Sequence, residues 1–315
     1  MTLSIVARDP DTGQLGIACQ SHFFGVGRLV GWLEPGVGAV ATQAFVNVGL
    51  GPQGLALLRS GATAQQALQA LSRSEDDVQF RQLAVVDCSG EVASQTGGAC
   101  VPAAGSVAGR QVSVQGNMLT SHEVYREALA AYELARDAPF VDRLLAALQA
   151  GERAGGDARG SQSAVLKVVT GRVSSRPWEE TIVDVRVDDH HDPVAELTRL
   201  AGLSKAYDGI GSVLFARGLM LGPYVGVSSD ELTHAILALE EARKTLGENF
   251  EAAFWYGVLL GRAGRVEEAC HVLLEVVAAQ PRWGRYLRSV VEAEIIKAEI
   301  LDPVFAALDA AEEIQ

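Results

Sequence analysis

The sequence has little positive charge. Its 315 residues include 39 aspartates and glutamates but only 26 lysines and arginines, so the formal net charge at pH 7 is -13. Phosphate backbones and anionic lipid headgroups repel such a chain. We therefore expect neither nucleic acid nor a membrane as a partner. Lysine is rare throughout, and none precedes Lys167.

Long apolar runs are also missing. No segment reaches the ~18 apolar residues of a membrane-spanning helix, and no basic stretch followed by an apolar one opens the chain. The cysteines lack the C-x-x-C spacing of redox and zinc motifs, and they are scattered as Cys19, Cys88, Cys100 and Cys270. Isolated thiols of this kind are typical of a reducing compartment. These absences predict a soluble cytoplasmic protein without a disulfide framework.

Several catalytic and cofactor motifs are absent or incomplete. No G-x-S-x-G sequence supports an α/β-hydrolase. Gly49-Leu-Gly-Pro-Gln-Gly54 fits the pattern G-x-G-x-x-G, but the next strand turns back at Cys88-Ser-Gly90, whereas a dinucleotide site requires parallel strands. Asp188-Asp-His-His-Asp192 has metal-ligating residue types, yet consecutive residues at a strand end point in opposite directions. We interpret it as a solvated corner in which Asp192 caps a helix, and we predict no metal and no cofactor.

A β-hairpin is predicted at the start of the chain. Apolar and polar residues alternate over Thr2-Leu-Ser-Ile-Val-Ala-Arg8, and alternation resumes from Gln14 to Cys19 after a turn. No leader precedes this strand, which would hold Thr2 in a fixed position in a sheet. If Met1 is removed, Thr2 carries a hydroxyl and a free α-amine with a pKa of about 7.7–8.0, which suits a base for that hydroxyl. The alternative is an edge strand without a chemical role.

The remaining pattern up to about residue 203 predicts hairpins interrupted twice by pairs of helices. The strands are expected at 36–42, 82–87, 91–96, 111–114, 163–169 and 181–187, and the helices at 55–58, 64–71, 121–136, 140–150 and from 193 onward. We expect Gln115-Gly-Asn117 to break the fourth of these strands. This order does not suit a doubly wound parallel sheet. It predicts an α+β fold, a four-layer α/β/β/α sandwich of antiparallel sheets with a helical layer on each side.

The second part of the chain changes composition. Residues 204–227 are rich in glycine and are predicted to be a linker with a short helix around 212–220, and residues 228–315 are predicted to be purely helical. Ala252-Ala-Phe-Trp-Tyr-Gly257, Gly264-Arg-Val-Glu-Glu-Ala269 and Gln280-Pro281 are similar to one tetratricopeptide repeat. One repeat is too short for a long groove, since about three are needed for a stable array. We expect this small all-α domain to pack on the first domain, on a second copy of itself or on a protein or peptide partner. Of these, self-association, as in a homodimer, is slightly preferred.

Five motifs in order resemble the domain-of-unknown-function family 1028 over about residues 1–203. They are Thr2-Leu-Ser-Ile-Val-Ala-Arg-Asp9, Gly36-Val-Gly-Ala-Val-Ala-Thr-Gln43, Val114-Gln-Gly-Asn-Met-Leu119, Gly155-Gly-Asp-Ala-Arg-Gly-Ser-Gln-Ser163 and Val187-Asp-Asp-His-His-Asp-Pro193. That family is similar to the N-terminal nucleophile (Ntn) hydrolases, which share the architecture of the proteasome β-subunit. The resemblance implies an amide (C–N) hydrolase acting on a small molecule or peptide.

The resemblance also implies roles for individual residues. Thr2 matches the nucleophile, provided that Met1 is removed. Gly116 matches the backbone N–H that stabilises the oxyanion, and Asp157 with Ser161 or Ser163 matches the pair that orients the terminal amine. Gln20 and Gln43 occupy positions where proteasome-like members have an aspartate and a lysine. The residues expected to shape the substrate pocket are Gln20, Ser21, His22, Gln43, Asn47, Gln115, Asn117 and Arg159.

Two hypotheses therefore stand. The first is an Ntn hydrolase in which the Thr2 hydroxyl attacks an amide and its own amine is the base. The second is a binding protein with an Ntn-like sandwich that has lost its chemistry and uses the helical domain for interactions. The missing lysine favours the second hypothesis, because a neutral glutamine cannot lower the cost of deprotonating a hydroxyl. A threonine at residue 2 of a predicted strand favours the first.

Overall fold

The structure, a computed structural model, describes residues 2–312 and has a mixed α+β fold. It divides into two compact units, one ending at Ala201 and the other beginning at Gly202. Each unit buries its own apolar clusters. In the part of the chain that is described, no helix has the length and apolar character needed to cross a membrane.

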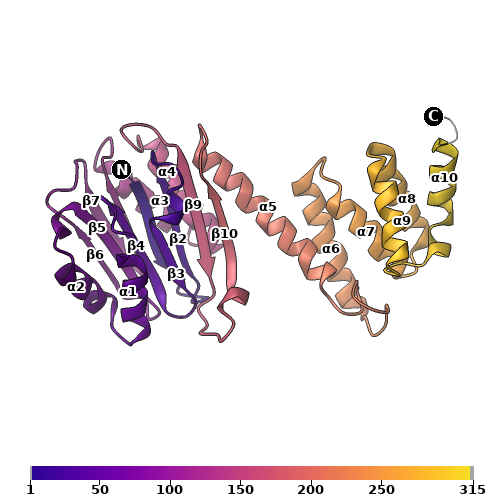
Figure 1. Cartoon of the computed structure of the whole chain (residues 1–315), viewed down its shortest axis with the longest axis horizontal. Helices are drawn as coiled ribbons and strands as arrows, with labels where there is room; N and C mark the ends of the chain where they lie inside the picture. The colour runs from indigo at the N-terminus through magenta and orange to yellow at the C-terminus, as the bar shows by residue number, and fades with distance from the viewer. Residues whose placement is uncertain (1, 313–315) are drawn as a thin grey trace. The chain divides into compact units, whose positions relative to one another are not determined.

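The N-terminal unit contains two antiparallel sheets (Figure 1). The larger sheet has the strand order β10-β9-β2-β1-β8-β7, so β1 lies near its centre with a partner on each side. Its strands are β1 Thr2–Arg8, β2 Leu15–Ser21, β7 Gly105–Gly109, β8 Val112–Asn117, β9 Ser163–Val169 and β10 Thr181–Val187. The smaller sheet has the order β3-β4-β5-β6, formed by β3 Gly31–Glu34, β4 Gly38–Ala44, β5 Arg81–Asp87 and β6 Val92–Thr96.

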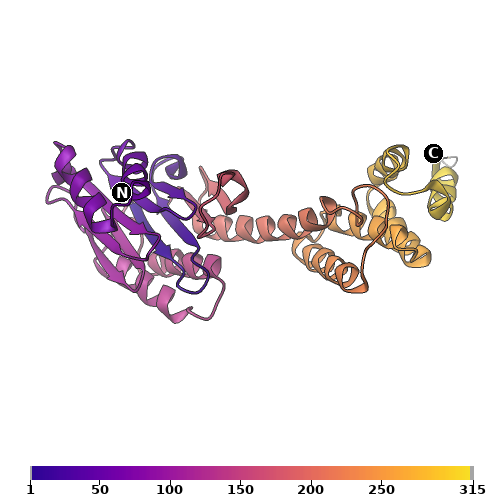
Figure 2. The same cartoon turned by 90° about the horizontal axis from the view of Figure 1, so that it is seen from below.

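Each sheet packs a pair of helices on one face and the other sheet on its opposite face. Helices α1 Leu50–Arg59 and α2 Ala64–Ser74 cover the smaller sheet, and α3 Glu123–Leu134 and α4 Phe140–Arg153 cover the larger one. Figure 2 shows the two pairs on opposite sides of the strands. Short 3-10 helices lie in the connections at η1 Val26–Arg28, η2 Val78–Phe80 and η3 Pro177–Glu179.

The alternation of side chains along β1 explains this packing. Leu3, Ile5 and Ala7 belong to the apolar cluster beneath α3 and α4. Val6 belongs to the cluster between the sheets, and Ser4 is buried on the same face. Successive residues of a strand point to opposite faces, so a strand buried on both sides has two apolar or satisfied faces.

The predicted hairpins are confirmed as β1–β2 and β5–β6. The break predicted at Gln115-Gly-Asn117 is wrong, because β8 continues to Asn117 and pairs with β1 on one side and β7 on the other. Pairing on both sides overrides the weak strand preference of glycine and asparagine. The predicted helix cap at Asp192 is confirmed, since its Oδ1 accepts a hydrogen bond from the Ala195 N–H at 3.1 Å.

The C-terminal unit is helical. Helix α5 Pro193–Leu214 begins in the first unit, and the others are α6 Ser229–Leu246, α7 Glu251–Arg262, α8 Val266–Ala279, α9 Arg282–Glu292, η4 Ala298–Ile300 and α10 Asp302–Glu312. The linker predicted over 204–227 is therefore wrong in its first half, which is the end of α5. Ala206, Ile210 and Val213 are buried in the core of this unit, and that burial offsets the glycines of the helix. Gly257 lets α7 and α8 pack closely, because a Cβ there would lie 2.7 Å from Leu273 Cγ.

Candidate functional site

A row of small polar side chains crosses the larger sheet at the level where β1 begins. Ser163 pairs with Ser21, and Thr2 pairs with Asn117, so the row runs over β9, β2, β1 and β8. All four residues are buried, Thr2 being 6% exposed and the other three 0%. Gln43 and Gln82 reach this row from the facing sheet. The candidate site is this polar layer between the sheets.

Thr2 is held loosely at its hydroxyl and firmly at its backbone. Its Oγ1 donates to Ser21 Oγ at 3.4 Å, a long and therefore weak hydrogen bond. Its carbonyl accepts a hydrogen bond from Gln43 Nε2 at 3.3 Å, and its backbone is part of β1. The hydroxyl is thus available for a new partner without the loss of a strong bond. Met1, on whose removal the predicted chemistry depends, lies outside the described residues.

Gln82 joins the two sheets at this level. Its Oε1 accepts hydrogen bonds from Gln43 Nε2 at 2.7 Å and from Asn117 Nδ2 at 2.9 Å. Its Nε2 donates to the carbonyl oxygen of Gly116 at 2.8 Å. The sequence analysis does not single out Gln82. The signal for it is an amide at a position of β5 whose alternation points between the sheets, where Ala84 and Val86 are buried.

Gln43 and Gln115 continue the layer two residues further along β1, at Ser4. Gln43 Oε1 accepts a hydrogen bond from Ser4 Oγ at 2.6 Å, and Ser4 Oγ accepts one from Gln115 Nε2 at 2.6 Å. Gln115 Oε1 in turn accepts from Ser113 Oγ at 2.9 Å. Gln115 therefore lies beneath the row that contains Thr2, and both ends of its amide are occupied within the protein.

Gly116 does not lie in a loop as predicted. It is buried within β8, and the direction of its absent Cβ is toward Leu119, whose Cδ1 would lie 2.5 Å away. Its residue position pairs with Leu3 of β1 and Gly105 of β7. A residue paired on both sides is not placed as the loop N–H that the resemblance implies, so we do not carry Gly116 forward as the oxyanion donor.

Asp157 anchors the loop that follows β2. Its side chain is fully buried, and its Oδ2 accepts a hydrogen bond from the His22 N–H at 2.9 Å. Its Oδ1 accepts from the Arg159 N–H at 2.8 Å and from Arg159 Nε at 3.4 Å. His22 is attached here through its backbone, and its side chain is exposed.

Ser163 and Ser161 lie on different faces of the larger sheet. Ser163 Oγ donates to the Phe23 carbonyl at 2.5 Å and accepts from the Val26 N–H at 3.1 Å, so it fixes the loop after Ser21. Ser161 Oγ instead contacts Gln20 Oε1 at 3.0 Å and Glu152 Oε2 of α4 at 2.7 Å. Gln20 therefore faces α4 and not the layer around Thr2. Burial raises the pKa of the Glu152 carboxyl, and the hydrogen bond from Ser161 lowers it less.

Asn47 is engaged on the helical side of the smaller sheet. Its Nδ2 donates to Glu75 Oε2 at 2.6 Å, and its Oδ1 accepts from the Gly49 N–H at 3.1 Å. The Asn47 hydrogen bond is the main reason why the pKa of Glu75 is lowered. Both ends of this amide serve the turn before α1, so the structure does not bring Asn47 together with Thr2.

The strand ends next to the polar layer carry unusual backbone and apolar surface. Ala44 and Met118 follow Gln43 and Asn117 directly and have φ values of 72° and 53°. Such left-handed residues cost about 1–3 kcal/mol each and concentrate at functional sites. Phe23 and Phe45 lie close by in sequence and are 55% and 51% exposed. Exposed phenylalanines beside a buried polar layer are suited to contact an apolar group of a ligand.

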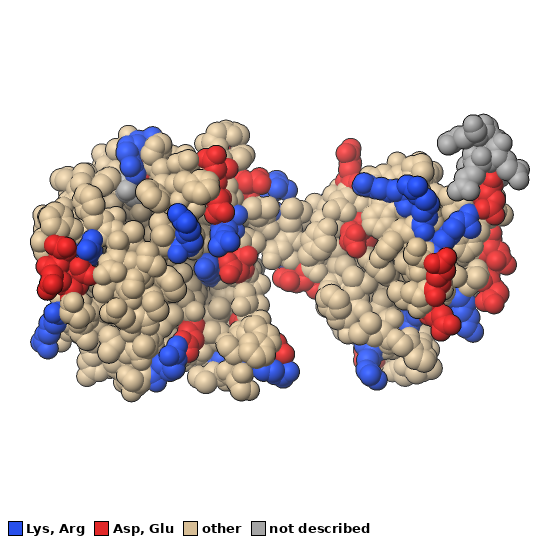
Figure 3. Space-filling model, viewed as in Figure 1, with Lys and Arg blue, Asp and Glu red and all other residues tan. Residues whose placement is uncertain are grey.

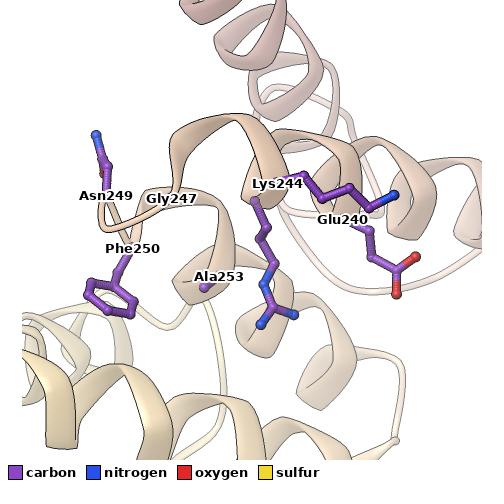
Figure 4. Close-up of a pocket in the computed structure, with 7 residues that line it drawn as sticks. Glu240, Lys244, Gly247, Asn249, Phe250 and Ala253 are labelled. Carbon is purple, nitrogen blue, oxygen red and sulfur yellow. The ribbon is translucent and has the colours of Figure 1, made fainter.

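The charged surface and the C-terminal pockets do not define a second site. On the face seen in Figure 3, acidic and basic side chains of the N-terminal unit are scattered over a larger uncharged surface. A hollow of about 500 Å³ lies at the end of α6, where Figure 4 shows Glu240 and Lys244 on the helix and Asn249 and Phe250 on the following turn. Its charged lining consists of one acidic and two basic side chains, Glu240, Arg243 and Lys244, and it is open to solvent.

A protein family and a solved structure are similar to this chain. A mixed fold of two antiparallel sheets and four covering helices, with a polar layer at the start of β1, is the class that this unit defines. Residues 2–197 match the model of a family of unknown function, DUF1028, and the chain belongs to that family. It is similar to the crystal structure of protein SPO2555 from Silicibacter pomeroyi, also assigned to DUF1028. The TM-score is 0.57 and the identity 32%, over 63% of this chain and 87% of that one. No curated protein matches the chain.

Proposed function

We propose that the N-terminal unit is an Ntn-type amide hydrolase with the four-layer α/β/β/α sandwich of that superfamily and Thr2 as its nucleophile. The observation that carries the proposal is the position of Thr2. It is the first residue of a strand in the interior of the larger sheet and it faces a buried polar layer. Among the described residues, its hydroxyl makes one hydrogen bond, of 3.4 Å. A nucleophile needs a backbone that is fixed in place and a hydroxyl that is not engaged in a strong hydrogen bond.

The proposed reaction requires no group besides the chain itself. After Met1 is removed, the α-amine of Thr2 takes the proton of its hydroxyl as Oγ1 attacks the carbonyl carbon of the substrate. The C–N bond then breaks, the proton passes to the leaving nitrogen, and an ester to Oγ1 remains. Water hydrolyses that ester with the same amine as base. An α-amine with a pKa of about 7.7–8.0 is partly neutral near pH 7 and suits this role.

The supporting residues have distinct proposed roles. Ser21 receives the hydrogen bond of the Thr2 hydroxyl and orients it, and Gln43 holds the Thr2 carbonyl. Asp157 and Ser163 fix the loop that directly follows Ser21, through the His22 N–H and the Phe23 carbonyl. We therefore propose that Asp157 and Ser163 act on the site through this loop. We propose that His22, Arg159 and the exposed phenylalanines contact the substrate where it enters.

A covalent probe tests the proposal without a known substrate. A β-lactone acylates an activated threonine when Oγ1 attacks the ring carbonyl and the ring C–O bond breaks. We expect intact-mass analysis to show loss of Met1 and addition of one probe, located at Thr2 by peptide mapping. The Thr2→Ala variant should show no addition, while Thr12→Ala, a change in the surface turn after β1, should react as the wild type does. A chain that retains Met1, or equal reaction of Thr2→Ala, contradicts the proposal.

The alternative is a binding protein with an inactive sandwich and a tetratricopeptide-like helical unit. The observation in its favour is that Gln43 is neutral and that its amide is already hydrogen-bonded to Ser4, Gln82 and the Thr2 carbonyl. Such a protein would resist the β-lactone while folding normally. Its helical unit would then act by self-association, which light scattering of the purified chain would show as a dimer, or through a protein partner.

A further inference from the structure

Two backbone carbonyls determine the direction of every hydrogen bond around Gln82. The carbonyl oxygens of Gly105 and Gly116 lie 3.1 Å and 2.8 Å from Gln82 Nε2. A carbonyl oxygen only accepts hydrogen bonds, so the atom that faces both of them must be the NH₂ group. The opposite end of the Gln82 amide is therefore the acceptor Oε1. This assignment needs no choice between the two orientations of the amide.

The orientation of Asn117 follows from that of Gln82. The Asn117 atom that lies 2.9 Å from Gln82 Oε1 must be a donor, which makes it Nδ2. Asn117 Oδ1 consequently points away from Gln82. It is buried and has no hydrogen-bond partner among the residues that the structure describes. Buried carbonyl oxygens are rarely left without a donor, so this atom marks the place of a missing partner.

The missing partner lies next to Thr2. Asn117 is the residue opposite Thr2 in the register of β1 and β8, and residues opposite each other place their side chains on the same face of a sheet. The polar groups that surround this position are the neutral side chains of Thr2, Ser21, Gln43 and Gln82. A cationic donor would be buried among them without a counter-charge, and the Thr2 α-amine would repel it when protonated. The partner is therefore an uncharged hydrogen-bond donor.

We propose that Asn117 Oδ1 accepts a hydrogen bond from the N–H of the amide that Thr2 attacks. The substrate class is then an uncharged amide with at least one N–H on the scissile nitrogen, because esters and tertiary amides lack the group that Asn117 binds. This inference rests on the proposed function. Oδ1 holds the nitrogen while the C–N bond breaks and the proton from the Thr2 amine reaches that nitrogen. The exposed rings of Phe23 and Phe45 suit an apolar group beside the bond.

Three probes with one benzyl substituent test the proposal: a β-lactam with a free ring N–H, its N-methyl derivative, and the corresponding β-lactone. Thr2 Oγ1 opens each ring, the bond from the carbonyl carbon to N or O breaks, and the proton passes to the released N or O. Intact mass gives the rate of each addition. In Asn117→Leu, whose side chain has a similar size and no polar atom, we expect the rate with the N–H lactam to fall by about tenfold or more. The rates with the lactone and the N-methyl lactam should change little.

Thr96→Val is the matched control, because Thr96 Oγ1 accepts a hydrogen bond from Gln82 Nε2 at 2.8 Å on the other side of the same network. It should leave the ratio of lactam to lactone rates unchanged. Equal loss with all three probes in Asn117→Leu would assign Asn117 to the Thr2 amine or to the fold and overturn the inference. Reaction of the wild type with the lactone but not with the N–H lactam would also overturn it. No reaction with any probe would instead refute the proposed function.

Discussion

At the scale of single residues, Ser161 has one hydroxyl hydrogen between two acceptors. Its Oγ lies 3.0 Å from Gln20 Oε1 and 2.7 Å from Glu152 Oε2. One hydrogen cannot serve both oxygens at the same time, so Gln20 and Glu152 compete for it. The pKa of Glu152 is raised, mainly by burial, and the hydrogen bond from Ser161 offsets part of that effect. Gln20 and Glu152 therefore have a structural role, because Ser161 links them between the larger sheet and α4.

Glu152→Gln should stabilise the protein at high pH. Because the pKa of Glu152 is higher in the folded than in the unfolded chain, the folded state binds more protons, and wild-type stability falls as pH rises through that folded pKa. The variant escapes this loss, so its Tm should exceed the wild-type Tm by about 2–4 °C at pH 8. The difference should vanish below the unfolded pKa of about 4.3. Calorimetry at several pH values, with exposed Glu127→Gln as the control, measures it, and a constant difference across pH contradicts it.

Two residues of the candidate site show what a sequence can and cannot give at this scale. Gln20 and Ser21 are adjacent on one strand, so alternation allows only one of them to face Thr2. The apolar pattern of β2 places Cys19, and hence Ser21, between the sheets. Gln82 could be recognised in the same way, as an amide on a buried face. Its three-way bonding to Gln43, Asn117 and Gly116 could not, because these residues come together only when the sheets stack.

At the scale of elements, α4 approaches β1 closely through a glycine. A Cβ at Gly151 would lie 2.3 Å from Leu3 Cδ2, and Leu3 is the residue after Thr2. A side chain at position 151 would therefore require the buried Leu3 side chain or the helix to shift. The loop from α4 back to β9 then carries Asp157 to the same end of the sheet.

Gly151→Ala should destabilise the unit by about 1–3 kcal/mol, because the methyl group overpacks a buried contact. It should also slow β-lactone addition at Thr2, since α4 or β1 must shift. Urea unfolding measures the first effect and intact mass the second. Gly98→Ala is the matched control, because a Cβ there meets no atom within 4 Å. A Gly151→Ala variant as stable and as reactive as the control would show that the contact relaxes freely.

Strands were predicted better than their ends. Alternation of apolar and polar side chains indicates β1, β2, β5 and β6, because this pattern continues over several residues of each strand. The end of β8 was missed, since glycine and asparagine usually break strands and the pairing with β1 and β7 is invisible in one segment. The length of α5 was missed for a similar reason. Its glycines predict a linker, whereas buried Ile210 and Val213 hold the helix together.

At the scale of the whole molecule, the chain has two units with separate cores. The apolar clusters of the first unit contain residues up to Ala201, and the cluster of the second begins at Ala206. Every residue of the candidate site belongs to the first unit. The proposed chemistry therefore does not require a side chain from the helical unit.

A fragment of residues 1–203 should fold and react. It keeps Val194, Leu197 and Ala201 of α5, which are buried against the larger sheet's helical side, and it omits the second core. We expect its rate of β-lactone addition to stay within about threefold of the full chain, as for a domain with its own core. Circular dichroism and intact mass check folding and reaction. A folded fragment that does not react would show that the helical unit completes the site.

The two faces of β1 have a consequence for how the chain tolerates length changes. One face meets aliphatic side chains of the α3 and α4 side, and the other meets the amides of Gln43 and Gln115. Sliding β1 by a single position would set Leu3 against those amides and Ser4 among the aliphatic groups. Only one register of β1 against its neighbouring strands is therefore compatible with both faces. If a residue is inserted in β1, the strand cannot restore its contacts by shifting its register. The residue pairs along β1 therefore fix which residue occupies the first position of the strand.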